Sequence, residues 1–270
     1  MNSILEHRLH VLMKTLCQMG SVMVAFSGGV DSTLLLKCAA EALGRENVVA
    51  VTASSDTLKP EDLERAKGLA HLIGVRHIVI GTSEMEDPEY VANTPDRCYL
   101  CKKLRFSMLA HLKDEMGIAY IADGANADDE GDYRPGMRAL AELGIRSPLR
   151  EAGLRKAEVR EAAKAFGLPN WDLPSQACLA SRFPYGTKLT PERLKQVYES
   201  EKLVNSLGVR QVRVRYHGDV ARIEVPAGDI GLLVKHREEV VEGLKKIGFI
   251  YVTLDLQGFR SGSLNEALNR

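Results

Sequence analysis

The chain has 270 residues, of which 45% are hydrophobic and 27% are charged, so it is long enough for one large globular domain or two smaller ones. Lysine plus arginine and aspartate plus glutamate both number 36, and the resulting net charge of zero argues against a large nucleic acid as the main partner. Because no apolar run approaches the roughly 20 residues that span a bilayer, and the first residues lack a signal-peptide pattern, we expect a cytoplasmic protein without a membrane partner.

Strands and helices are predicted to alternate through the first half of the chain. Residues 1–20 have helical spacing of apolar positions and end at Gly20. Short apolar runs predict strands, and the stretches between them predict helices. The strands are expected at 22–25, 48–53, 77–80 and 118–124, and the helices from 33 to 40, from 60 to 74 and from about 102 to 116. This alternation favours an α/β fold, with a parallel sheet covered by helices on both faces.

The chain changes character after a predicted helix at 153–167. Prolines at 169, 174 and 184 exclude regular structure from most of residues 169–186. The remainder predicts a small α+β domain with a mixed or antiparallel sheet. Its elements are a helix from Thr190-Pro191 to Gly208, strands at 211–216, 220–225 and 251–256, and a helix at about 228–247. We therefore expect two domains, 1–186 and 187–270.

The segment Ala25-Phe26-Ser27-Gly28-Gly29-Val30-Asp31-Ser32 joins the first predicted strand to a helix. Its two glycines let backbone N–H groups approach a phosphate, and the helix N-terminus adds partial positive charge. The Ser27 and Ser32 hydroxyls can donate further hydrogen bonds. The Gly-Lys-Ser/Thr ending of a Walker A loop is missing, so no lysine of the loop reaches the terminal phosphates. This loop suits pyrophosphate as a leaving group better than transfer of the last phosphoryl group.

Polar residues follow several of the predicted strands. Asp31, Thr52 and Asp123 with Gly124 fall at carboxyl ends of strands, where parallel sheets bind their ligands. We expect one shared nucleotide crevice there. Its predicted residues are Ala25, Ser27, Gly28, Gly29, Val30, Asp31, Ser32, Thr52, Asp123 and Gly124.

Three of the five cysteines are candidate ligands, namely Cys98 and Cys101 in a Cys-x-x-Cys and Cys178 in the proline-punctuated loop. Redox dithiols, zinc sites and iron–sulfur sites share the Cys-x-x-Cys pattern. Three thiolates fit a four-iron cluster with one open iron better than a structural zinc, although a histidine such as His111 could complete a zinc site. Cys17 and Cys38 lie on apolar faces of predicted helices, and we expect them to be buried.

The residues Ser27 to Ser32 resemble the SGGxDS signature of the PP-loop ATP pyrophosphatases, which cleave ATP between the α and β phosphates to adenylate a substrate. Nearly the whole chain resembles the LarE family of sulfur transferases within that superfamily. This resemblance rests on three further segments: Cys178-Leu179-Ala180-Ser181-Arg182-Phe183-Pro184-Tyr185-Gly186, Val212-Arg213-Val214-Arg215-Tyr216-His217 and Gly258-Phe259-Arg260-Ser261-Gly262-Ser263.

The resemblance implies a reaction and its cofactors. LarE proteins use ATP and Mg²⁺ to adenylate the carboxylates of pyridinium-3,5-biscarboxylic acid mononucleotide and convert them to thiocarboxylates, for the nickel-pincer nucleotide cofactor of lactate racemase. One type sacrifices the sulfur of a single cysteine, at the position of Cys178. The other binds a [4Fe-4S] cluster through three cysteines and transfers sulfide from the open iron. Because this chain has Cys98, Cys101 and Cys178, it resembles the cluster type.

Further roles follow from the resemblance and from residue chemistry. Asp31 is expected near Mg²⁺, with Ser32 in the loop, and Arg182 beside Cys178 is expected to add charge at the departing pyrophosphate. Arg213 and Arg215 alternate on one strand, so they share a face that could clamp the substrate phosphate, unless it is a solvated strand face.

Three residues near these arginines are less sharply predicted. Ser181 is expected to hydrogen-bond substrate. Glu201 and Glu224 are metal or substrate contacts by family analogy, or else surface carboxylates.

Three rival functions share the loop. A PP-loop tRNA thiolase would need a basic surface for nucleic acid, which the zero net charge disfavours. Ammonia-using synthetases such as NAD or GMP synthetase do not need three cysteines. A non-catalytic ATP sensor would give the arginines no purpose. By resemblance we also expect a homo-oligomer, a hexamer, with the second domain binding substrate and mediating assembly.

Overall fold

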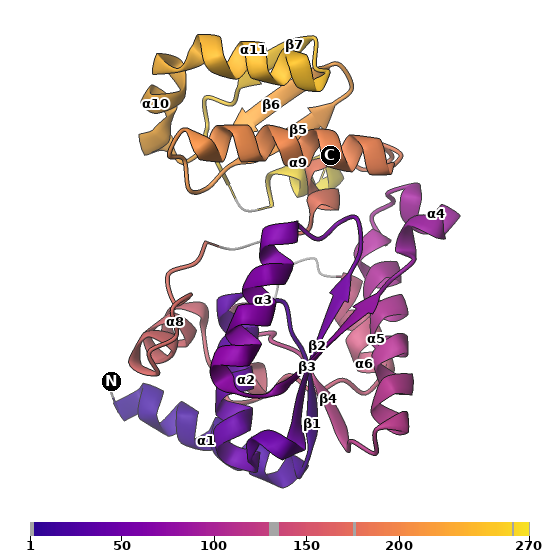
Figure 1. Cartoon of the computed structure of the whole chain (residues 1–270), viewed down its shortest axis with the longest axis vertical. Helices are drawn as coiled ribbons and strands as arrows, with labels where there is room; N and C mark the ends of the chain where they lie inside the picture. Colours follow the sequence, from indigo (N-terminus) through magenta and orange to yellow (C-terminus); the bar gives the residue numbers. More distant parts are fainter. Residues whose placement is uncertain (1–2, 130–134, 175–176, 261, 270) are drawn as a thin grey trace. The chain divides into compact units, whose positions relative to one another are not determined.

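The computed structural model describes the chain except for residues 1–2, 130–134, 175–176, 261 and 270 (Figure 1). Ser261, in one of the family-like segments, therefore lies outside the described residues. The chain forms two compact units: Met1–Glu84 with Asp96–Gln176, and Met85–Pro95 with Ala177–Arg270. This division differs from the expected boundary at residue 186. No helix within the described residues has the length and apolar character needed to cross a membrane.

The first unit is built on a four-stranded sheet in the order β3-β2-β1-β4, with every pair of neighbours parallel. Period-two alternation gives both faces of the sheet an apolar surface. On β1, Val22 and Val24 face one buried cluster and Met23 faces the other. The strands are β1 Val22–Ala25, β2 Val48–Ser54, β3 Arg76–Gly81 and β4 Tyr120–Ala122. The expected α/β sheet is thus confirmed, with a shorter fourth strand.

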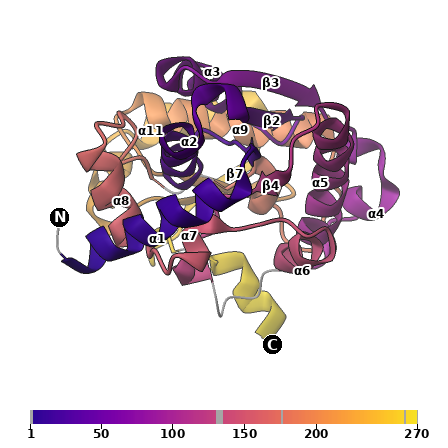
Figure 2. The same cartoon turned by 90° about the horizontal axis from the view of Figure 1, so that it is seen from below.

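Helices cover both faces of this sheet (Figure 2). The first buried cluster contains residues of α1 Ser3–Met19, α2 Val30–Leu43, α3 Pro60–Ile73, α7 Pro148–Glu151 and α8 Lys156–Ala165. The second contains residues of α5 Arg97–Glu115 and α6 Pro135–Glu142. Helix α5 begins earlier than expected, so Cys98 and Cys101 lie within its first five residues. The short helices α6 and α7 were not predicted.

The second unit contains a three-stranded sheet, in which β5 and β6 are antiparallel and β6 and β7 are parallel. Of the two sheet types expected, mixed or antiparallel, the mixed sheet is found. The expected helix at 228–247 is wrong, because it divides at His236 into two helices. The elements are α4 Pro88–Val91, α9 Pro191–Ser206, β5 Arg213–His217, β6 Val220–Glu224, α10 Ile230–Lys235, α11 Arg237–Ile247 and β7 Tyr251–Leu254.

The segment Met85–Pro95 belongs to the second unit through contacts with the proline-punctuated loop. The backbone N–H of Gly186 donates to the Asn93 carbonyl at 2.9 Å, and that of Leu189 donates to the Val91 carbonyl at 2.8 Å. The Asn93 side chain donates to the Pro184 carbonyl at 2.8 Å. These contacts give order to a loop that has no regular structure beyond a 3₁₀ turn at Leu179–Arg182 among its described residues.

Candidate active site

The loop between β1 and α2 has the conformation of an anion cradle. The Ser32 hydroxyl accepts from the Ser27 backbone N–H at 3.3 Å and donates to the Gly29 carbonyl at 3.2 Å. The two serine hydroxyls are 3.2 Å apart. Helix α2 begins at Val30, so its first N–H groups have no partner within the helix and can meet an anion.

Gly28 makes the tight turn of this loop, and residues distant in sequence hold it. Its φ of +69° is strained for any other residue, and a Cβ there would lie 3.0 Å from the Ala66 backbone. The Gly28 carbonyl accepts from Arg65 Nε at 3.2 Å and from Asn170 Nδ2 at 3.1 Å. Asn170 also donates to the Thr33 hydroxyl at 3.0 Å. The role of Asn170 in holding the loop was not predicted, because no local sequence pattern connects it to Gly28.

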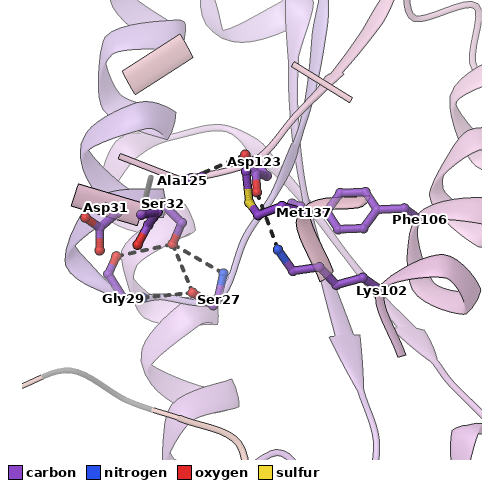
Figure 3. A pocket seen from close by; sticks show the side chains of 12 residues that line it. Ser27, Gly29, Asp31, Ser32, Lys102, Phe106, Asp123, Ala125 and Met137 are labelled. Atoms are coloured by element: carbon purple, nitrogen blue, oxygen red, sulfur yellow. Dashed lines mark hydrogen bonds and ion pairs between the residues drawn. The ribbon is translucent and has the colours of Figure 1, made fainter. Parts of the chain in front are cut away.

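A pocket of about 400 Å³ lies at the carboxyl ends of the strands, against the loop (Figure 3). Seven of the ten predicted nucleotide residues line it: Ala25, Ser27, Gly29, Asp31, Ser32, Asp123 and Gly124. Its other lining residues are Lys102, Phe106, Ala125, Asp129 and Met137. Gly28, Val30 and Thr52 are not among the lining residues.

Thr52 is buried in the sheet, and its side chain contacts two neighbouring residues and no pocket. Its hydroxyl donates to the Phe26 carbonyl at 2.7 Å and lies 2.8 Å from Nε2 of His77. Burial, and next the charge of Lys67, lower the pKa of His77. Because the Thr52 hydroxyl uses its proton on the Phe26 carbonyl, the tautomer with its proton on Nε2 completes this contact. Thr52 therefore fixes the strand that leads into the phosphate loop.

Asp31 is held by two residues that the sequence analysis did not select. Lys156 Nζ forms an ion pair with Oδ2 of Asp31, and Asn126 Nδ2 donates to Oδ1 at 3.1 Å. Asn126 is buried, and its backbone N–H donates to Asp129 at 2.9 Å. Both oxygens of the Asp31 carboxylate are thus oriented before any ligand enters.

Asp123 is placed on the other side of the pocket by a similar set of contacts (Figure 3). Its Oδ1 accepts from the Ser147 hydroxyl at 2.6 Å, and Lys102 Nζ lies 3.9 Å from its Oδ2. Gly124 follows, and a Cβ there would lie 2.9 Å from the backbone nitrogen of Ser32. Only glycine therefore lets the end of β4 come this close to the start of α2.

Cys98 and Cys101 lie three residues apart near the start of α5, and therefore share one face of the helix. Cys98 is exposed, and Arg97, which is buried, donates to its sulfur at 3.8 Å. Because a helix rises 1.5 Å per residue, His111 is about 15 Å from Cys101 along the same helix and cannot complete a zinc site with it. This excludes the proposed zinc alternative through His111.

Cys178 belongs to the second unit, where it is exposed at the start of the 3₁₀ turn. Among the described ranges of the chain, no three His, Cys, Asp or Glu side chains gather closely enough to hold a metal ion. The expectation for the other cysteines is half right. Cys38 is buried, which raises the pKa of its thiol to about 12, whereas Cys17 is exposed.

Arg182 has its charge compensated inside the second unit. Its side chain is fully buried, and its guanidinium donates to both carboxylate oxygens of Glu201, at 2.8 and 2.9 Å. It also donates to the carbonyls of Ala177 and Cys178, at 2.6 and 2.9 Å, and to the Ser181 hydroxyl at 3.0 Å. Contact with pyrophosphate would break a buried ion pair, at a cost of about 3–5 kcal/mol. Arg182 is therefore not available to bind pyrophosphate, and its hydrogen bonds instead hold the backbone at Ala177 and Cys178.

Arg215 links the same segment to strand β6. It donates to the Ser181 carbonyl at 2.9 Å and to Oε2 of Glu224 at 2.7 Å, and is only 5% exposed. Glu201 and Glu224 are both fully buried, so their interpretation as surface carboxylates is wrong. The alternative of a solvated strand face for Arg213 and Arg215 is wrong for the same reason.

Arg213 adds a further positive charge to this buried group. Its guanidinium donates to the Val212 carbonyl at 2.8 Å and lies over the Phe259 ring at 5.2 Å. Burial, and next the charge of Arg182, lower the pKa of Arg213 to about 10, so it remains charged at neutral pH. Among the described residues of the second unit, arginines 182, 213 and 215 are buried together with glutamates 201 and 224. Guanidinium groups gathered in this way can bind an anionic ligand.

The similarity of this chain to known proteins is consistent with the observed phosphate loop and parallel sheet. Residues 5–91 match the model of the NAD synthase family. An argininosuccinate synthase of Methanothermobacter thermautotrophicus is 27% identical over 57% of this chain and 41% of its own length. The parallel sheet, the Ser-Gly-Gly loop and the pocket beside it define a PP-loop ATP pyrophosphatase domain.

Two relatives extend over nearly the whole chain. Pyridinium-3,5-bisthiocarboxylic acid mononucleotide synthase of Lactiplantibacillus plantarum is 44% identical over 96% of this chain and 94% of its own length. An uncharacterized protein of Synechocystis sp. is 45% identical over 98% of this chain and 100% of its own. The chain belongs to the LarE family, that of the pyridinium-3,5-bisthiocarboxylic acid mononucleotide synthases.

Proposed function

We propose that this protein adenylates the carboxylates of pyridinium-3,5-biscarboxylic acid mononucleotide with ATP and converts them to thiocarboxylates, in the biosynthesis of the nickel-pincer nucleotide cofactor. The observation that carries this proposal is the 44% identity to the synthase over 96% of the chain, together with a formed pocket at the phosphate loop. The tRNA thiolase alternative is not favoured, since a relative named for a mononucleotide product matches both units of the chain.

The loop and α2 serve the first step. The substrate carboxylate is ionised at neutral pH, so it can attack the α phosphorus of ATP without a protein base. The backbone N–H groups at the start of α2, from Val30 to Ser32, then stabilise the departing pyrophosphate. Asp31, with both oxygens oriented, would hold Mg²⁺, which neutralises phosphate charge when bound.

The cysteines serve the second step. Their donor set fits an iron–sulfur cluster, because Cys98 and Cys101 are two cysteines three residues apart on one helix and Cys178 is an exposed cysteine. Held by these three residues, a [4Fe-4S] cluster would supply sulfide at the iron that no cysteine binds. Arg182 and Arg215 fix the backbone on either side of Cys178, which keeps that thiol in one position.

The proposal predicts the products of ATP cleavage. The purified protein, reconstituted anaerobically with iron and sulfide and given Mg-ATP, the pyridinium dicarboxylate and added sulfide, should release AMP and pyrophosphate, with gain of a thiocarboxylate in the product. Chromatography of the nucleotides and mass spectrometry of the product measure both results. Release of ADP and phosphate would rule out the PP-loop reaction, and AMP without a sulfur-containing product would leave adenylation but reject sulfur transfer.

We further propose that Arg213, which is charged at neutral pH and interacts electrostatically with Arg182 and Arg215, binds the phosphate of the substrate. Replacing Arg213 with alanine should weaken substrate binding by about 1–3 kcal/mol, on the scale of one charge-assisted hydrogen bond. Because the phosphate loop lies in the other unit, ATP binding should be unchanged. Titration calorimetry with each ligand tests this. Arg237→Ala is the control, since Arg237 is an exposed arginine whose ion pair is with Glu238. Equal loss of ATP and substrate binding would reject this assignment.

A further inference from the structure

Arg105 lies on the same face of α5 as the two cysteines and pairs there with a buried carboxylate. It follows Cys98 by seven residues and Cys101 by four, so the three side chains share one stripe of the helix. Its guanidinium forms an ion pair with Glu84, whose side chain is only 1% exposed. Burial by itself raises the pKa of Glu84, but the charge of Arg105 and further hydrogen bonds lower it overall. The carboxylate is therefore ionised at neutral pH, with Arg105 as its counter-ion.

The same guanidinium joins α5 to the carboxyl ends of two strands. Its Nη2 donates to the Ser55 hydroxyl at 3.0 Å and lies 3.2 Å from the Thr57 hydroxyl. Ser55 directly follows β2, and Glu84 is the third residue after β3. Arg105 thus holds the cysteine-bearing helix to the end of the sheet at which the nucleotide pocket also lies.

Glu84 is also the residue at which the chain leaves the first unit. The segment Met85–Pro95 that follows belongs to the second unit, and the chain returns at Asp96, two residues before Cys98. Within the second unit, this segment makes the hydrogen bonds that hold the loop of Cys178. The ion pair therefore fixes, on the cysteine-bearing helix, the start of the segment that holds the loop of the third cysteine.

We infer that Arg105 and Glu84 form a positioning pair, which keeps the start of the segment Met85–Pro95 fixed to the cysteine-bearing face of α5 and so favours binding of one cluster by all three cysteines. The inference rests on the proposed cluster. A carboxylate with almost no access to water that loses its cation has to take up a proton or move into water. Either change releases Glu84 from α5, and the segment that follows loses its fixed start. Neither side chain of the pair is among the residues that line the pocket at the phosphate loop.

The test uses the full-length protein, reconstituted anaerobically with iron and sulfide. Arg105→Gln removes the charge and keeps a polar side chain. We expect this variant to lose iron to a ferrous chelator about tenfold faster than the wild type, as followed by the absorption of the cluster. Given Mg-ATP, the pyridinium dicarboxylate and added sulfide, it should yield less than about half as much thiocarboxylate per AMP, while AMP forms within about twofold of the wild-type rate. Arg105→Lys, which keeps the charge, should recover part of both losses.

Two further variants separate positioning from a loss of stability. Lys113→Gln removes a cation from the other end of α5, where Lys113 is paired with Asp114, and it should behave as the wild type does. Glu84→Gln combined with Arg105→Gln leaves no unpaired charge at this position. The double variant should melt closer to the wild-type temperature than Arg105→Gln does, yet lose iron as fast, because the ion pair is still absent.

The outcomes distinguish this inference from the proposed function. Iron loss at the wild-type rate in Arg105→Gln would overturn the inference. Recovery of both the melting temperature and the iron retention in the double variant would also overturn it, because the pair would then act only through stability. A wild-type protein that forms AMP but takes up no iron would instead reject the proposed cluster, and the inference with it.

Discussion

Replacing any one of Cys98, Cys101 and Cys178 with alanine is expected to lower the iron content of the anaerobically reconstituted protein and to abolish sulfur transfer. The three losses should be alike, because a cluster that retains only two of its thiolate ligands is labile. Formation of AMP from ATP should be largely retained, since none of these cysteines lines the pocket at the phosphate loop. Iron and sulfide analysis, the absorption spectrum and a nucleotide assay measure the three results on the same samples.

Cys17→Ala is the matched control, because Cys17 is also exposed and free but has no proposed role. It should keep iron and activity. Intact-protein mass spectrometry after several equivalents of product distinguishes the two sulfur sources. An unchanged mass agrees with a cluster, whereas dehydroalanine at position 178 would show that Cys178 gives up its own sulfur. In that case only Cys178→Ala would be inactive.

Asp31→Asn is expected to lower the rate of AMP formation by about 100-fold or more, equal to roughly 2.7 kcal/mol of transition-state stabilisation. The substitution keeps the size of the side chain and an oxygen that can accept from Asn126, but it removes the charge that would hold Mg²⁺. Because Asp31 is part-exposed, the free energy of unfolding should change by no more than about 1 kcal/mol. Rates of AMP release and thermal melts measure the two effects.

The control for this variant is Asp114→Asn, which removes a carboxylate from the surface of α5, where Asp114 is paired with Lys113. It should cleave ATP at the wild-type rate. Retention of AMP formation in Asp31→Asn would mean that this carboxylate is not part of the reaction, and that the loop alone neutralises the phosphates.

Local sequence patterns were sufficient to predict the phosphate loop, several helix and strand positions and most residues of the pocket. The Ser-Gly-Gly loop was identified because strand, turn and helix follow one another within ten or so residues, and each has its own composition signal. The helix start at Thr190-Pro191 is confirmed in the same way: the Thr190 hydroxyl accepts from the backbone N–H of Arg193 at 3.3 Å. Seven predicted nucleotide residues line one pocket because parallel strands end at one edge of their sheet.

Only the tertiary structure decided which side chains complete the site. Lys156, Asn126 and Asn170 reach the loop from 125, 95 and 142 positions away, and no spacing rule connects them to it. The solvent exposure of individual side chains could not be predicted from the sequence either. Arg182 is expected from sequence at the departing pyrophosphate but is fully buried with Glu201, whereas Cys17, expected to be buried, is exposed. The physical reason is that local periodicity fixes the direction of a side chain relative to its own element, whereas its charge partner and its solvent exposure depend on the elements that pack against it.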